Sequence, residues 1–319
     1  MQTIAEIAQT IKRCEKFVIF GHSIPDGDCV GSVLALYLGL LQLGKQVKAV
    51  LPEEVPQLYR YLEGAEAVGT IELDDMDGVA IFLDCADELR VMQENISQLK
   101  NYDLIINMDH HPSNNLFADM NYVDPRAAAT AEIVFQLLLD LRVDITIDIA
   151  NALYAGLVMD SGRFMNSNTG GDTLRIAAGL LESGVDINQV RSSLFESKSW
   201  AEVRLLSLAL QSIKPFFNGQ VAVMQLAYTD IIAAEAKGLH PEGIIDYARS
   251  IEGVEIAVLL REIEPEQVKI GFRSRSRIDV ARVAAKLGGG GHRQAAGAVV
   301  NAALPLALER VLTVIGEVI

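Results

Sequence analysis

The sequence predicts an α/β protein of two domains: an N-terminal domain built on a parallel sheet, and a smaller C-terminal α/β domain, with a cleft between them. Three observations predict this class. The chain has 319 residues, which is more than a typical single domain. Its first 190 residues alternate short apolar runs with longer helix-like runs. The C-terminal region contains two adjacent strand-like runs that suggest a hairpin.

Short runs rich in Val, Ile, Leu and Phe predict the strands of the first domain. Runs of this composition are typical of parallel strands that are buried on both faces. The predicted strands are residues 16–20, 46–50, 79–83 and 103–107. The predicted helices lie near residues 27–43, 129–141, 148–159 and 172–183. This alternation predicts a parallel sheet that is covered by helices on both faces.

The second domain follows a polar stretch at 188–211 that is predicted to be helical and to connect the two domains. A strand is expected at 221–226, and strands at 253–261 and 267–273 form a predicted hairpin around Glu264-Pro265-Glu266. A helix near 279–287 leads into four glycines, and the final helix is predicted near 304–318. The expected boundaries are 1–190, a helical linker at 191–211, and 212–319.

Composition and charge narrow the class of protein. The net charge is −15, and the first 190 residues contain 12 Lys and Arg against 28 Asp and Glu. An acidic body argues against binding long duplex nucleic acid, because neutralised phosphates drive that affinity. No apolar stretch predicts a membrane span, and residues 1–6 resemble no signal segment, so we expect a cytoplasmic protein without a membrane partner. The cysteines (Cys14, Cys29, Cys85) are too few for a disulfide framework, and we expect them to be reduced and buried.

Acidic and imidazole side chains follow three of the predicted strands. His22, Asp26 and Asp28 follow the first, Asp84 follows the run 79–83, and Asp109-His110-His111 follows 104–108. The carboxyl ends of parallel strands meet at one edge of a sheet, where α/β proteins gather their site residues. So many carboxylates in one pocket would repel each other unless a divalent metal neutralised them.

Each of these segments also has a structural interpretation. Asp26 or Asp28 is a plausible helix N-cap, which would explain one carboxylate but not the set. Asp84 at a strand end is either a turn former or a ligand that gives one oxygen to each of two metals. Asp160 follows the helical run 149–159, where Gly162 would complete a C-terminal turn, although an acid there opposes the helix dipole.

The adjacent histidines predict a division of roles. Both are hard to place in an apolar core, because each ring needs partners for two nitrogens. Neighbouring side chains in an extended segment diverge, so one imidazole is expected to bind metal and the other to face substrate. Asp109 is expected to orient an imidazole from behind.

A glycine run at 288–291, followed by His292, marks the second domain. Glycines permit close backbone approach, and their N–H groups, followed by an expected helix start, suit a phosphate or carboxylate oxygen. We therefore expect Gly289, Gly290, Gly291 and His292 to contact substrate. Upstream, Arg273 with Ser274 ends a strand and is expected to contact a phosphate or base, while Arg275 and Arg277 are alternatively solvated edge residues.

These motifs, in this order, resemble the DHH phosphoesterases with a C-terminal DHH-associated domain. The resemblance spans nearly the whole chain. Within that family, the compact two-domain length is similar to the bacterial NrnA-like nanoRNases, which also dephosphorylate nucleoside 3′,5′-bisphosphates. The resemblance implies a catalytic, metal-binding first domain and a substrate-binding second domain. The long extra domains of the RecJ exonucleases have no counterpart in this sequence.

The resemblance also implies a metal site and a reaction. It implies two Mn²⁺ ions, with Mg²⁺ or Co²⁺ as alternatives, and the mixed imidazole and carboxylate set independently favours Mn²⁺ over Mg²⁺. One ion would be held by His22, Asp26 and Asp84. The other would be held by Asp28, Asp84, His110 and Asp160. The expected catalytic residues are Asp84, Asp109 and His111, and the expected reaction is two-metal hydrolysis of a phosphoester.

The expected substrates are short oligoribonucleotides and nucleoside 3′,5′-bisphosphates such as pAp. One alternative is a phosphodiesterase acting on linear or cyclic dinucleotides of the pApA or cyclic di-AMP type. Another is a nucleotide-binding protein without catalysis, although the complete ligand set argues against it. A homodimer is compatible with the sequence, which decides neither the oligomeric state nor the order of substrate preference.

Overall fold

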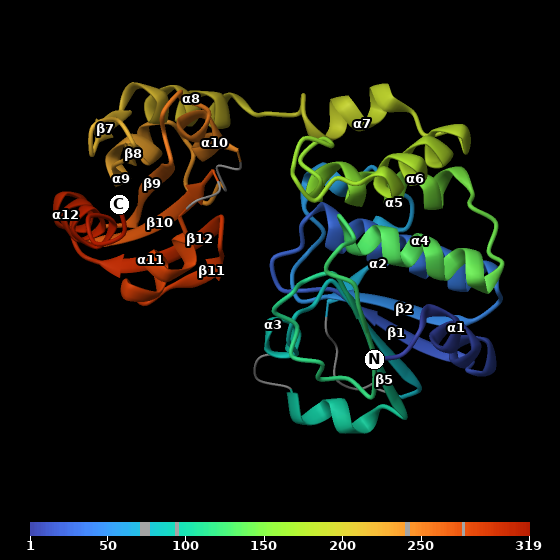
Figure 1. Cartoon of the computed structure of the whole chain (residues 1–319). Helices are drawn as coiled ribbons and strands as arrows, with labels where there is room; N and C mark the ends of the chain where they lie inside the picture. The colour runs from blue at the N-terminus through green and yellow to red at the C-terminus, as the bar shows by residue number, and fades with distance from the viewer. Residues whose placement is uncertain (71–76, 93–95, 240–242, 276–277) are drawn as a thin grey trace. The chain divides into compact units, whose positions relative to one another are not determined.

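The computed structural model describes residues 1–70, 77–92, 96–239, 243–275 and 278–319. By backbone contacts the chain divides into two compact units, Met1–Ser197 and Lys198–Ile319. In its described residues, each unit contains one sheet (Figure 1). Among the described residues, every helix is too short or too polar to cross a bilayer.

The first unit is built on a parallel sheet of six strands in the order β3-β2-β1-β4-β5-β6, with every neighbouring pair parallel. The strands are β1 (Lys16–Phe20), β2 (Gln46–Leu51), β3 (Gly69–Thr70), β4 (Val79–Leu83), β5 (Leu104–Asp109) and β6 (Met120–Val123). The four predicted strands are therefore confirmed. The short edge strands β3 and β6 were not predicted, because neither carries a sustained apolar run.

The helices of the first unit are α1 (Ile4–Arg13), α2 (Gly27–Gln42), α3 (Leu89–Met92), α4 (Thr130–Leu141), α5 (Ile147–Asp160), α6 (Gly171–Glu182) and α7 (Ile187–Leu194). Short 3₁₀ turns lie at Gln57–Tyr59, Ala65–Ala67 and Ile96–Asn101. Helices α2 and α4 pack on one face of the sheet, and α5 packs on both of them. The main apolar core lies between these layers, and a smaller core covers the opposite face of the sheet.

Helices α2 and α5 approach each other unusually closely at two glycines. A Cβ atom added to Gly31 would lie 2.3 Å from the backbone oxygen of Ala152, and one added to Gly156 would lie 3.1 Å from Asp28 Oδ1. Larger residues at these positions would force the helices apart. This contact therefore determines the separation between Asp28 on α2 and Asp160 at the end of α5.

The second unit has a sheet of six strands in the order β11-β12-β10-β9-β8-β7. The β8–β9 pair is parallel and the other pairs are antiparallel. The strands are β7 (Lys214–Phe216), β8 (Val221–Leu226), β9 (Ile256–Glu264), β10 (Gln267–Ser274), β11 (Gly290–His292) and β12 (Ala295–Asn301). The predicted hairpin around Pro265 is confirmed as β9 and β10.

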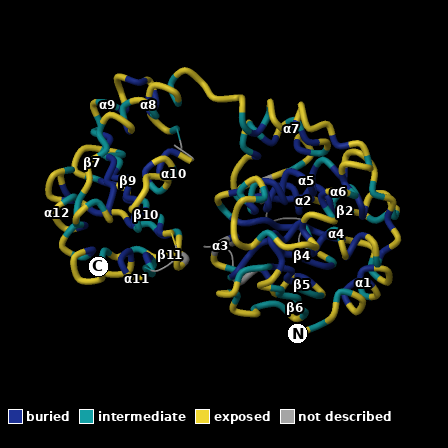
Figure 2. The backbone as a smooth tube through the Cα atoms, turned by 45° about the horizontal axis from the view of Figure 1, so that its top comes forward, coloured by how far each residue is buried: buried dark blue, intermediate teal, exposed yellow. Residues whose placement is uncertain are grey.

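Helices cover both faces of this second sheet. They are α8 (Trp200–Gln211), α9 (Tyr228–Ala233), α10 (Ile244–Arg249), α11 (Val280–Lys286) and α12 (Leu304–Ile315). One apolar core lies against α11 and α12, and another lies against α8, α9 and α10. Buried residues lie along the central strands of each sheet (Figure 2). The predicted α/β class is confirmed for both units.

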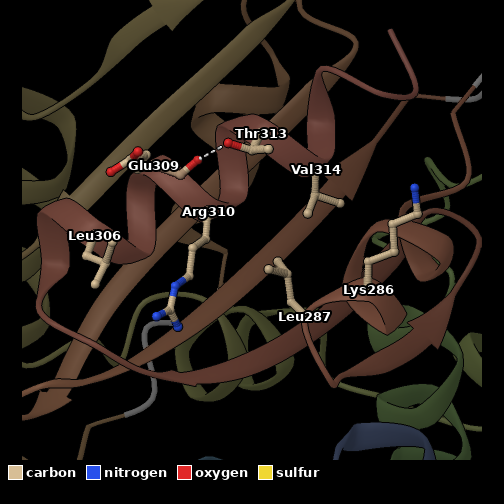
Figure 3. A pocket seen from close by; sticks show the side chains of 7 residues that line it. All are labelled: Lys286, Leu287, Leu306, Glu309, Arg310, Thr313 and Val314. Carbon is tan, nitrogen blue, oxygen red and sulfur yellow. Dashed lines mark hydrogen bonds between the residues drawn. The ribbon is translucent and has the colours of Figure 1, made fainter.

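A shallow hollow lies over α11 and α12 on the second unit (Figure 3). Its lining residues are Lys286, Leu287, Leu306, Glu309, Arg310, Thr313 and Val314. Thr313 donates its hydroxyl to the Glu309 carbonyl at 2.9 Å. None of these lining residues belongs to the predicted site.

One expectation for the second unit was wrong. The glycine run was expected to lead into a helix, but it forms β11, which pairs with β12. A Cβ atom at Gly289 would lie 2.0 Å from the Gly297 backbone oxygen, and one at Gly291 would lie 2.6 Å from that of Ala295. These two glycines are therefore required for backbone packing between strands, and no helix N-terminus follows them.

Candidate metal centre

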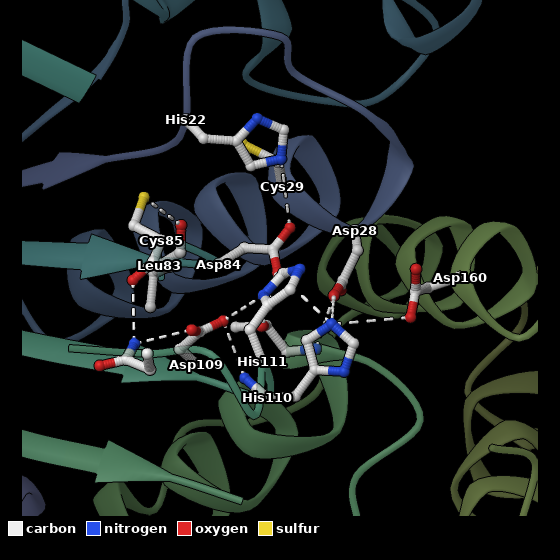
Figure 4. A network of polar contacts seen from close by, with 12 residues as sticks. His22, Asp28, Cys29, Leu83, Asp84, Cys85, Asp109, His110, His111 and Asp160 are labelled. Carbon is white, nitrogen blue, oxygen red and sulfur yellow. Dashed lines mark hydrogen bonds and ion pairs between the residues drawn. The ribbon is translucent and has the colours of Figure 1, made fainter. Parts of the chain in front are cut away.

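The predicted acids and imidazoles of the first unit gather at the carboxyl ends of three neighbouring strands (Figure 4). His22 follows β1, Asp84 follows β4, and Asp109 is the last residue of β5. Helices bring the remaining carboxylates: Asp28 lies in the first turn of α2, and Asp160 is the last residue of α5. Residues from five separate elements therefore meet at one edge of the sheet.

Three overlapping groups of donor atoms form within this cluster. One consists of Asp84, His110 and His111, and His111 Nδ1 lies 3.6 Å from Asp84 Oδ1. The other two share no residue with each other, and we call these two the donor groups: His22, Asp26 and Asp84 form one, and Asp28, His110 and Asp160 form the other. In each group, one ligand atom per residue lies within 4.8 Å of the others, so each group could hold a metal ion.

Asp84 connects the two groups. Its Oδ2 atom lies 3.4 Å from His22 Nε2, while its Oδ1 atom lies 3.6 Å from His110 Nε2. The residue is buried and has a left-handed backbone, with a φ of 60°, which Asp tolerates better than most residues. This strained turn points the carboxylate between the two imidazoles, and each oxygen faces a different group.

Asp28 is held firmly by donors from two other helical turns. Its Oδ1 atom accepts from Ala131 N at 2.9 Å and Ser32 Oγ at 3.2 Å. Its Oδ2 atom accepts from Thr130 N at 2.6 Å. A carboxylate oxygen has two lone pairs, so Oδ1 is saturated and Oδ2 retains one site. Asp28 therefore suits a cation as a ligand through a single oxygen.

Asp26 and Asp160 occupy opposite ends of helices. Asp26 is the N-cap of α2, where its Oδ1 atom accepts from the backbone N–H of Asp28 and of Cys29. Helix capping therefore accounts for the position of Asp26 Oδ1, as the N-cap interpretation predicted. The second oxygen, Oδ2, takes no part in the capping bonds. Asp160 Oδ2 lies 3.6 Å from His110 Nε2, at the unfavourable end of the α5 dipole.

The two adjacent histidines have different partners. His110 Nδ1 lies 3.3 Å from the Ala127 carbonyl, which favours the tautomer that donates there and directs Nε2 toward the acids. His111 Nδ1 lies 2.7 Å from Asp109 Oδ1. Asp109 is fully buried and also accepts from His110 N at 2.8 Å and Asn114 Nδ2 at 2.7 Å. Asp109 therefore orients His111 and lies outside both donor groups.

The electrostatics of the cluster favour a bound cation. Burial by itself would lower the pKa of His22, but the carboxylates of Asp26 and Asp84 raise it to about 10. Burial likewise opposes the charge on His110, yet Asp28, Asp84 and Asp160 raise its pKa to about 9. Burial and the charge of Asp84 raise the pKa of Asp28 well above its ordinary value.

The pKa of Asp160 is also raised, to about 6, because the group is buried and lies near the charges of Asp84 and Asp26. Without a cation, the carboxylates depend on protonated imidazoles for compensation. Buried charges are normally paired or bind metals. A mixed set of oxygen and imidazole nitrogen ligands fits a transition metal such as Mn²⁺.

The residues predicted for substrate binding lie in the second unit. The Arg273 side chain is half-buried, and burial lowers the pKa of its guanidinium. Ser274 is buried, and its hydroxyl donates to the Arg293 carbonyl at 3.4 Å, which gives it a structural role. Space around Gly290 is open. The His292 side chain and Arg277 lie outside the described part of the chain.

Several residues that support the ligands of the first unit were not predicted from the sequence. Thr130 donates its hydroxyl to Asp84 Oδ1 at 3.0 Å, and Ser32 supports Asp28. Asn114 supports Asp109 and also donates to Asn107 Oδ1 at 2.8 Å. Asn107 is the one residue with a visible signal, because it is a polar residue within the apolar run of β5. The others lack a motif that would single them out.

Comparison with known proteins agrees with this geometry. Residues 16–157 match the DHH family, N-terminal domain, and residues 218–319 match the DHHA1 domain. The chain is 34% identical over 320 aligned residues to the bifunctional oligoribonuclease and PAP phosphatase NrnA of Thermus thermophilus, covering 99% of this chain and 94% of the relative. The chain belongs to the DHH family. The predicted resemblance is confirmed, and this DHH protein is a hydrolase of phosphoester bonds.

Solved structures support the fold of this DHH protein. An exopolyphosphatase-related protein from Bacteroides fragilis superposes with a TM-score of 0.93 at 24% identity, covering 98% of this chain and 95% of the other. The exonuclease RecJ bound to manganese gives a TM-score of 0.55 at 15% identity, with coverages of 98% and 94%. These likenesses establish a shared fold.

Proposed function

We propose that this protein is a Mn²⁺-dependent phosphoesterase that hydrolyses short oligoribonucleotides and nucleoside 3′,5′-bisphosphates. The observation that carries the proposal is the pair of donor groups joined through Asp84. The proposed substrate class is supported by a relative named for both activities, with which the chain aligns over nearly its full length.

The proposed ligands are His22, Asp26 and Asp84 for one ion, and Asp28, Asp84, His110 and Asp160 for the other. When bound, two divalent ions supply an activated water and neutralise charge on the phosphoryl oxygens. His111 is the proposed contact to the phosphate or the leaving oxygen. Because Asp109 engages Nδ1 of His111, Nε2 is the ring atom directed to that role.

In the second unit, Arg273 is the proposed phosphate contact. Its guanidinium is half-buried, and a planar guanidinium suits phosphate oxygens. The backbone of Gly289, Gly290 and Gly291, with His292, is proposed to contact the nucleotide end. The division into a catalytic domain at 1–190, a linker at 191–211 and a substrate-binding domain at 212–319 belongs to the same proposal.

A substrate panel tests the proposed function. The purified protein with Mn²⁺ is expected to release mononucleotides from RNA dinucleotides and pentanucleotides, and inorganic phosphate from pAp. Turnover of a long duplex is expected to be slower, because an acidic protein binds long nucleic acid poorly. A cyclic dinucleotide is included as a comparison substrate. Chromatography of products over time provides the measurement.

The panel also separates the alternatives. Hydrolysis of a cyclic or linear dinucleotide, with pentanucleotides and pAp left intact, would favour the dinucleotide phosphodiesterase. Binding of these compounds without any product would favour a nucleotide-binding protein. Either result would replace the proposal.

Ion binding is expected to release protons. The pKa values of about 10 for His22 and about 9 for His110 mean that both imidazoles hold a proton at neutral pH when no ion is present. A metal ligand must be neutral, so each imidazole loses its proton on binding, and affinity for Mn²⁺ rises from pH 7 toward pH 9.

Calorimetric titration with Mn²⁺ in two buffers of different protonation enthalpy measures the number of protons released. We expect at least about two protons per protein at neutral pH, one from each histidine, and any proton held by Asp28 is released in addition. A heat of binding that is independent of the buffer would contradict the expected protonation of these histidines.

A further inference from the structure

Thr130 is a buried residue that contacts both halves of the centre without belonging to either donor group. It is the first residue of α4 and has no exposed surface. Its backbone N–H donates to Asp28 Oδ2 at 2.6 Å, and its hydroxyl donates to Asp84 Oδ1 at 3.0 Å. One residue therefore binds a carboxylate from each of the two groups.

The start of α4 explains why Thr130 is placed there. The N-cap position of α4 is Ala129, whose side chain cannot accept a hydrogen bond. The first N–H groups of the helix are instead satisfied by Asp28, which accepts from Thr130 N and Ala131 N. Capping by a residue of α2 draws the first turn of α4 into the centre and brings the Thr130 hydroxyl against Asp84.

The Thr130 hydroxyl restricts how the Asp84 carboxylate can rotate. A hydroxyl has one proton, and this one is directed at Oδ1. With Oδ1 fixed beside His110, Oδ2 is directed toward His22 Nε2 at 3.4 Å. Rotation of the carboxylate would break the bond to Thr130 and place both oxygens nearer one group.

We propose that Thr130 is a positioning residue that holds Asp84 as a bridge, with one oxygen for each ion. The inference rests on the proposed function, since it requires that both groups bind ions. Loss of the hydroxyl leaves all six proposed ligands in place but allows Asp84 to turn toward one ion. The second ion should then bind more weakly, and turnover should fall with it.

The test compares Thr130→Val with Thr130→Ser. Valine keeps the shape of threonine and the backbone bond to Asp28 but lacks the hydroxyl, whereas serine keeps the hydroxyl. We expect Thr130→Val to lose about 10- to 100-fold in affinity for one of two Mn²⁺ ions and a similar factor in kcat, with KM little changed. Thr130→Ser is expected to keep both the Mn²⁺ affinity and the kcat of the wild-type protein.

Titration with Mn²⁺ alone and electron paramagnetic resonance of the loaded protein provide readouts besides activity. Two ions that share a bridging carboxylate give an exchange-coupled signal, which Thr130→Val should weaken. Thr173→Val is the matched control, because Thr173 is also buried in the first turn of a helix but its hydroxyl accepts from Gly170 N. The control should leave ion affinity and the coupled signal unchanged.

The outcomes separate the two levels of the proposal. Wild-type protein that binds no Mn²⁺ would refute the proposed function itself. Wild-type protein that binds two ions, with unchanged affinity and signal in Thr130→Val, would overturn only the role of Thr130. Equal losses in the valine and serine variants, or a lower melting temperature without a change in ion binding, would also overturn it.

Discussion

Asp84→Asn is expected to reduce phosphoester hydrolysis by about a thousandfold or more and to reduce the number of Mn²⁺ ions bound. The reason is geometric, because the two Asp84 oxygens face different donor groups at 3.4 and 3.6 Å from the imidazoles. Asparagine has the same size and tolerates the left-handed backbone at this position, so the fold should survive. Its amide, however, cannot supply two anionic oxygens.

Asp103→Asn is the matched control for this substitution. Asp103 is an exposed acid immediately before β5, at the opposite end of that strand from the cluster. Initial rates on pAp and a pentanucleotide, with ion stoichiometry by calorimetry, provide the measurements. Near-normal turnover of Asp84→Asn, in protein that melts like wild type, would refute the proposed bridging role.

Gly31→Ala is expected to lower both the stability of the first unit and its activity. The added Cβ atom would lie 2.3 Å from the Ala152 backbone oxygen, which cannot move without moving α5. We expect a loss of about 3 kcal/mol, at the upper end for an overpacked core. For a unit of this size, that loss corresponds to a decrease of roughly 6–12 °C in melting temperature.

The separation of α2 and α5 in Gly31→Ala should also change the metal centre. Asp28 lies one turn before Gly31 on α2, and Asp160 ends α5, so separation of the helices moves these two proposed ligands apart. We therefore expect weaker Mn²⁺ binding by Gly31→Ala even at temperatures where the protein is folded.

Gly179→Ala provides the comparison. Gly179 is also within a helix, but no atom lies within 4 Å of an added Cβ. Alanine there should stabilise the unit by about 0.5–1 kcal/mol, because glycine is unfavourable in a helix. Scanning calorimetry measures both variants. Similar melting temperatures for Gly31→Ala and Gly179→Ala would contradict the close helix contact.

The sequence was most informative where the fold follows a simple rule. The apolar runs identified the central strands, and the carboxyl ends of neighbouring parallel strands meet at one edge, so His22, Asp84 and Asp109 were expected together. Asp160 was harder to place, because it comes from a helix end and only its unfavourable position in the dipole singled it out.

Features that depend on contacts between distant elements were not predictable. Thr130 looks like an ordinary helical residue until α2 supplies the cap that places it beside Asp84. Gly31 reads as a tolerated helix glycine until α5 lies against it. The glycine run misled for a related reason, since Gly289 and Gly291 are needed for close packing against β12 rather than for a turn into a helix.

The capping of α4 by Asp28 has a consequence for kinetics. The Asp28 carboxylate already accepts hydrogen bonds from Ser32, Thr130 and Ala131. It therefore loses little conformational freedom when an ion binds. Asp28 is therefore positioned during folding and not when an ion binds. The speed of ion capture should then follow how quickly the ion sheds its hydration water, so ions that exchange water slowly should load slowly even where their final affinity is high.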